Sequence, residues 1–79
     1  MRLDKYLKVS RLIKRRTVAN EACDAGRVSV NGKPARASYD VKIGAVLTIA
    51  LGTREVSVEV VNVQETVAKN DAALLYKLL

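Results

Sequence analysis

The chain has 79 residues, 49% of them hydrophobic, a size and composition that predict one small folded domain rather than a disordered segment. Its 14 Lys and Arg against eight Asp and Glu give a formal net charge of +6, which favours a polyanionic partner. Histidine is absent and Cys23 is the only cysteine, which excludes His-based catalysis, an internal disulfide and a Cys/His metal site. Because the apolar runs are short and interrupted by charge, we expect no membrane partner. The charged first residues and the single cysteine predict a cytoplasmic location.

The positive charge is concentrated in the first half of the chain. Residues 1–36 contain ten basic and three acidic residues, a net charge of +7, whereas residues 37–79 contain four basic and five acidic residues, a net charge of −1. A generally soluble basic surface would intersperse both signs instead. A cationic half joined to a nearly neutral half predicts a binding face for nucleic acid.

A first helix is predicted over residues 2–14. Leu3 and Tyr6 recur at helical spacing, and we expect Tyr6 to enter the core. Asp4 stands four residues before Lys8, a spacing that favours an ion pair on an exposed helix face.

A second helix is predicted over residues 17–25. The Thr17 hydroxyl can cap its start, and Gly26 can end it in the left-handed conformation. We expect Val18, Ala22 and Ala25 to face inward.

After Gly26 the apolar residues alternate, which is typical of strands. The pair Asn31-Gly32 predicts a tight hairpin between residues 28–30 and a return strand at 33–37, which Pro34 confines to an edge. Further strands are predicted at 46–51 and 56–60, joined by a turn at Gly52-Thr53.

The C-terminal residues 69–79 are predicted to form a last helix. The order of elements predicts an α+β fold in which two N-terminal helices pack on a small, mostly antiparallel sheet, with a C-terminal helix. We expect residues 1–63 to form the RNA-binding domain and residues 64–79 to be a helical extension of it.

The junction of the two predicted helices carries Arg15, Arg16 and Thr17, where the free N–H groups and positive dipole of a helix start favour a phosphate. Three tyrosines are the only aromatic residues, too few for a platform on which single-stranded bases stack. The sequence therefore predicts binding to the phosphates and shape of folded RNA. A DNA-binding module is the alternative, but the second helix carries Glu21 and Asp24 and has little with which to read a major groove.

The run RLDKYLKVSRLIKRRTVANEACDAGRVSVNGKPA at residues 2–35, followed by VKIGAVL at 41–47, resembles the S-four RNA-binding domain family. The whole length, including KNDAALLY at 69–76, is similar to stand-alone bacterial quality-control factors of the RqcP type, which are related to heat-shock protein fifteen. The resemblance implies binding to large ribosomal subunits obstructed by peptidyl-tRNA, with contacts to large-subunit rRNA and to tRNA. It also implies assistance to a partner protein that adds alanine tails to the stalled chain, and no chemistry or cofactor of its own.

In that family the start of the first helix and the helix junction contact RNA. The carry-over to this chain comprises Arg2, Lys5, Arg15, Arg16 and Thr17, and further Lys8, Arg11, Lys14, Asn20, Arg27 and Lys33. We expect a monomer. Two other functions stay open: subunit recycling of the heat-shock-fifteen type, which the lack of a long basic C-terminal extension disfavours, and a protein adaptor that uses the apolar C-terminal segment.

Overall fold

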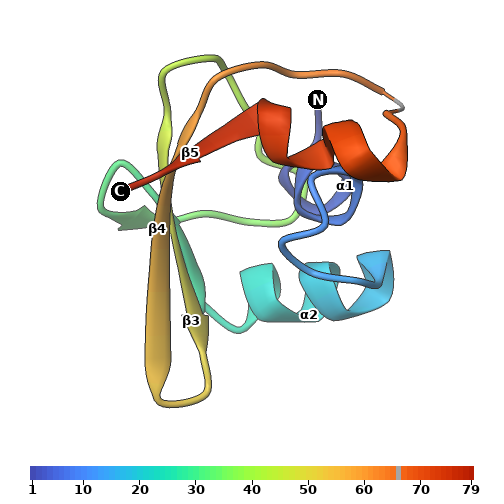
Figure 1. Ribbon diagram of the computed structural model, residues 1–79. Coiled ribbons are helices and arrows are strands. Elements are labelled where there is room, and N and C mark those ends of the chain that lie inside the picture. The colour runs from blue at the N-terminus through green and yellow to red at the C-terminus, as the bar shows by residue number, and fades with distance from the viewer. Residues whose placement is uncertain (66) are drawn as a thin grey trace.

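The computed structural model describes residues 1–65 and 67–79, in which helical segments cover one face of a five-stranded sheet (Figure 1). The elements in chain order are α1 (Leu3–Val9), α2 (Arg16–Asp24), β1 (Val28–Val30), β2 (Lys33–Pro34), β3 (Val46–Leu51), β4 (Arg54–Val60), the 3-10 helix η1 (Lys69–Leu75) and β5 (Tyr76–Leu78). The strand order is β2-β1-β3-β4-β5, and every neighbouring pair is antiparallel. The predicted α+β fold is confirmed. None of the helices in the described ranges is both long and apolar enough to cross a membrane.

The first helix is shorter than predicted. It ends at Val9, because Ser10 is its C-cap and Arg11 takes a left-handed backbone conformation with φ +63°. Helices often end in this conformation, which is usually adopted by glycine. Leu3, Tyr6 and their neighbour Leu7 are fully buried, so α1 contributes one apolar face to the core.

The second helix begins one residue earlier than predicted, at Arg16, with Arg15 as its N-cap and no side-chain cap. The predicted Thr17 cap is therefore wrong, and so are the predicted inward positions of Val18, which is 48% exposed, and of Ala25, which is also exposed. The residues of α2 that enter the core are Ala19 and Cys23.

Gly26 ends α2 as predicted, with φ +78°. The N–H of Gly26 donates to the Cys23 carbonyl oxygen and the N–H of Arg27 to that of Ala22, the paired hydrogen bonds of a Schellman motif. The chain is thereby turned directly into β1.

The sheet has a buried and an open face. Asn31 and Gly32 have φ values of +52° and +85°, which makes the predicted β1–β2 hairpin a type I′ turn. The return strand is shorter than predicted and comprises Lys33–Pro34.

Alternate side chains of β1, β3 and β4 face α1 and α2 in the core, namely Val28, Val30, Leu47, Ile49, Val58 and Val60.

The C-terminal segment is helical only in part. Residues 69–75 form η1, but Tyr76–Leu78 is strand β5, in which Tyr76 pairs with Val60, so the prediction of a helix to residue 79 is wrong there. The buried Tyr6 hydroxyl donates to the Leu75 carbonyl oxygen at 2.6 Å and ties this segment to α1. Residue 66 of the predicted 64–79 extension lies outside the described residues, and the division at residue 63 stays a prediction.

Candidate nucleic-acid interface

One buried carboxylate joins α1 to α2. Asp4 is 2% exposed and accepts hydrogen bonds from Arg2 Nε at 3.2 Å, Arg2 Nη2 at 3.3 Å, Asn20 Nδ2 at 3.2 Å and the Lys5 backbone N–H at 2.8 Å. Arg16 Nε lies 3.4 Å from Asp4 Oδ2. Asp4 thus holds two basic side chains at one point, that of Arg2 just before α1 and that of Arg16 at the start of α2.

The electrostatics of Asp4 follow from these contacts. Burial by itself would raise its pKa, but the hydrogen bonds from Arg2, Asn20 and the Lys5 backbone, with the positive charge of Arg16, lower the pKa below the ordinary 3.8. Asp4 is therefore ionised at neutral pH. It orients the cations while burying little of their charge, because the side chains of Arg2 and Arg16 stay 50% and 48% exposed.

The position of Arg2 is also set by its backbone. Arg2 forms an isolated antiparallel bridge with Asp40, flanked by hydrogen bonds from the Leu3 N–H to the Tyr39 carbonyl oxygen and from the Val41 N–H to the Met1 carbonyl oxygen, both at 2.8 Å. Because the first residues are tied to the 37–41 loop, Arg2 is presented on an ordered backbone.

A surface hollow of about 460 Å³ opens beside this pair of arginines. Its lining is formed by Arg2, Asp4, Arg16, Thr17, Asn20 and Glu21. Arg16 and Thr17 belong to the first turn of α2, whose backbone N–H groups have no side-chain cap. Guanidinium groups beside an uncapped helix start suit the oxygens of a phosphate group.

A second cationic group lies where α1 ends. Lys8, Arg11 and Lys14 line a smaller hollow of about 130 Å³ together with Val9, Glu65 and Val67. The left-handed turn at Arg11 brings the three cations to one opening. Arg15, at the start of α2, is exposed and makes no ion pair with any residue in the described ranges.

The S4 domain family model matches residues 1–47. The chain belongs to the S4 domain family. It is 56% identical to the RQC P-site tRNA stabilizing factor of Halalkalibacterium halodurans, over 99% of this chain and 89% of that protein. It is 54% identical to the factor of the same name from Bacillus subtilis, over 100% of this chain and 92% of that protein. Among solved structures, the trimeric structure of Vibrio cholerae heat shock protein 15 superimposes with a TM-score of 0.93 and 31% identity, over 100% of this chain and 81% of that one.

Two predicted site residues of this S4 domain stand apart from the rest. Arg27 is exposed at the C-terminal end of α2, opposite the helix start that Arg16 occupies. Lys33 is exposed on the β1–β2 hairpin, whose turn lies beyond β3 and β4 from α1 and α2 in Figure 1. The structure therefore does not bring Lys33 together with the helix junction.

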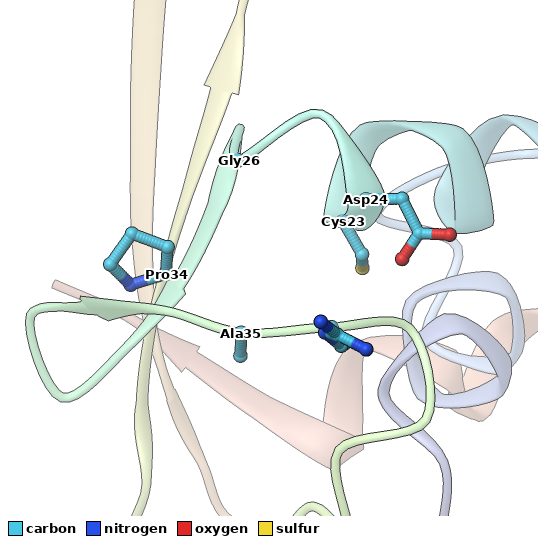
Figure 2. A pocket seen from close by; sticks show the side chains of 6 residues that line it. Cys23, Asp24, Gly26, Pro34 and Ala35 are labelled. Atoms are coloured by element: carbon cyan, nitrogen blue, oxygen red, sulfur yellow. The ribbon is translucent and has the colours of Figure 1, made fainter.

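Figure 2 shows a further hollow, which lies between the C-terminal end of α2 and the segment that includes β2. Its lining is formed by Cys23, Asp24, Gly26, Pro34, Ala35 and Arg36. Cys23 is buried, and burial together with the charges of Asp4 and Asp24 raises the pKa of its thiol to about 11. Cys23 is therefore a protonated, packed side chain at neutral pH.

Sequence reasoning missed the role of Asp4. The predicted exposed pair with Lys8 is wrong, because Asp4 faces α2 and contacts Arg2, Arg16 and Asn20 instead. No spacing rule within one helix reveals a contact between residues 4 and 16. A carboxylate among so many cations was the available signal.

Proposed function

We propose that this S4 domain binds the phosphate backbone of structured RNA, contacting large-subunit rRNA and tRNA on ribosomal subunits obstructed by peptidyl-tRNA. Support comes from the Halalkalibacterium halodurans and Bacillus subtilis relatives, which carry the name RQC P-site tRNA stabilizing factor and align over nearly the whole chain. The observation that carries the proposal is the pair Arg2 and Arg16, held on Asp4 beside the open start of α2.

The physical reason is preorganisation. A flexible arginine loses side-chain entropy when it grips a phosphate, whereas Arg2 and Arg16 are already oriented through Asp4 before RNA arrives. Their remaining N–H groups are arranged as planar forks that match phosphate oxygens. Lys8, Arg11 and Lys14 extend the positive surface around the C-terminal end of α1, and Arg15 extends it at the junction.

In this proposal the domain acts by geometry and performs no chemistry. It holds tRNA against the large subunit in the cytoplasm, as a monomer, while a separate partner protein adds alanine to the stalled chain. Arg27 and Lys33 then meet a different stretch of RNA from the one at the helix junction, because they lie at the far end of α2 and on the hairpin.

Subunit recycling of the heat-shock-fifteen type is the second candidate. The close superposition on the Vibrio cholerae protein favours it, although only 31% of the residues are identical. Both candidates use the same RNA face, and they differ in the ribosomal complex that is recognised. Preferential binding to subunits that carry peptidyl-tRNA and an alanine-tailing partner supports quality control.

The experiment compares the tRNA binding of two charge-matched variants. Binding is measured by fluorescence anisotropy at several salt concentrations. Arg15→Gln removes an exposed cation at the helix junction, and Arg54→Gln removes an exposed cation at the start of β4. We expect Arg15→Gln to weaken binding about three- to tenfold and to reduce the slope of log affinity against log salt by about one. Arg54→Gln should change affinity by less than about twofold. Equal losses in both variants, or duplex DNA bound as tightly as tRNA, would contradict the proposal.

A further inference from the structure

An acidic side chain from outside the S4-matching residues reaches into the cationic face. Glu65 follows β4 in the chain, and its carboxylate forms an ion pair with Lys5 Nζ on α1, 60 residues away in sequence. Glu65 also lines the smaller hollow together with Lys8, Arg11 and Lys14. One carboxylate therefore lies within a cluster of positive charge.

The Glu65 carboxylate has the same cationic surroundings that an RNA phosphate would have at this place. The hydrogen bond and charge of Lys5 lower its pKa, and the more distant charges of the N-terminus and Arg16 act in the same direction. The carboxylate is thus an ionised oxygen ligand surrounded by cations, which is also the description of a bound phosphate oxygen. The cations of the hollow outnumber this acid, so the site keeps a net positive charge when Glu65 is present.

The ion pair is exposed enough to exchange. The Glu65 side chain is 70% exposed and the Lys5 side chain 34% exposed, so water and salt reach both groups. Exposed pairs of this kind are weak, and their loss changes an equilibrium by at most about fivefold. A phosphate that brings several contacts can therefore replace the carboxylate at Lys5.

We propose that Glu65 stands in for an RNA phosphate in the free protein, and that a phosphate replaces it at Lys5 in a site completed by Lys8, Arg11 and Lys14. The inference rests on the proposed RNA-binding function and adds a specific ligand group and a competing residue. Glu65 lowers affinity for RNA, because each binding event must break its ion pair. RNA that brings a phosphate into this hollow displaces the Glu65 carboxylate from Lys5. Polyanions that make only non-specific contacts outside the hollow do not displace it.

The test measures tRNA binding of four charge variants, three single and one double, by fluorescence anisotropy at low salt. Glu65→Gln keeps the shape of the side chain and removes the competing charge, so we expect binding about two- to fivefold tighter than wild type. The gain should shrink as salt rises, because exposed charges are screened. Glu55→Gln, on the exposed start of β4, makes the same change of net charge and should leave affinity within about 1.5-fold.

Substitution of Lys5 separates true competition from diffuse repulsion. Lys5→Gln should weaken binding more in the Glu65→Gln background than in wild type, by the same two- to fivefold factor, because only then is Lys5 unoccupied beforehand. Equal effects of Lys5→Gln in both backgrounds, or equal gains from Glu65→Gln and Glu55→Gln, would overturn the inference while leaving RNA binding intact. Failure of the wild-type protein to bind tRNA would instead refute the proposed function on which the inference rests.

Discussion

Substitution of Asp4 by asparagine sets two physical expectations against each other. The change raises the net charge by one, and a purely electrostatic view therefore expects tighter RNA binding. However, an amide has fewer acceptor sites than a carboxylate, and its own NH₂ group would face the donors of Arg2, Arg16 or Asn20. If Asp4 positions the arginines, the variant binds RNA more weakly despite its additional positive charge.

The magnitude follows from burial and from the state of each partner. Asp4 is 3% exposed in its side chain, but its arginine partners are about half exposed and can be hydrated once released. The loss is therefore below the 3–5 kcal/mol typical of a fully buried pair. We expect a loss of unfolding free energy of about 1–2 kcal/mol, which corresponds to a melting temperature lower by about 5–15 °C for a domain of this size.

The assay combines thermal unfolding with anisotropy of labelled tRNA at a temperature where the variant is fully folded. RNA affinity should fall about three- to tenfold, because Arg2 and Arg16 must then be ordered during binding. Asp71→Asn is the matched control, since Asp71 is exposed on η1 and the substitution changes the net charge equally. Tighter tRNA binding by Asp4→Asn, with an unchanged melting temperature, would refute a positioning role for Asp4.

Two further predictions concern stability. Because the folded-state pKa of Asp4 is lowered, its contribution is fully present above the ordinary value of 3.8 and is lost as the pH falls through the folded-state pKa. The difference in melting temperature between wild type and Asp4→Asn should hence stay constant from neutral pH to about pH 5 and shrink below pH 4; a difference that grows in acid would contradict this sign. Tyr6→Phe should lower unfolding free energy by about 0.5–1.5 kcal/mol in urea denaturation, the net value of one hydrogen bond, because the Leu75 carbonyl oxygen still accepts from the N–H groups of Val61 and Asn62. No change in unfolding free energy would mean that this hydrogen bond does not hold the C-terminal segment.

Local backbone chemistry decided which elements could be predicted from sequence. Asn31-Gly32 and Gly26 were read correctly because positive φ values at a hairpin and at a helix end select these residue types. The end of α1 was not predicted correctly, because Arg11 takes a left-handed conformation that arginine rarely adopts. Tyr76–Leu78 has helical composition but pairs with β4, so tertiary contacts override local propensity there.

The candidate site was predictable as a collection of charges and not as a geometry. The charge excess of residues 1–36 placed the cations on the N-terminal half without any structure. The contacts that organise them join residues far apart in sequence, Asp4 with Arg16 and Lys5 with Glu65. Such pairs depend on how α1 packs against α2 and on the path of the chain after β4, which no local pattern records.

The most direct test of the proposed function is co-sedimentation of the purified protein with large ribosomal subunits, with and without peptidyl-tRNA, at a low and a moderate salt concentration. We predict that the protein sediments with the subunits at low salt and is retained better when peptidyl-tRNA is present. The bound fraction should fall steeply as salt rises, as expected for binding dominated by phosphate contacts. The proposed ribosomal role would be contradicted if the protein did not sediment with either kind of subunit at either salt concentration.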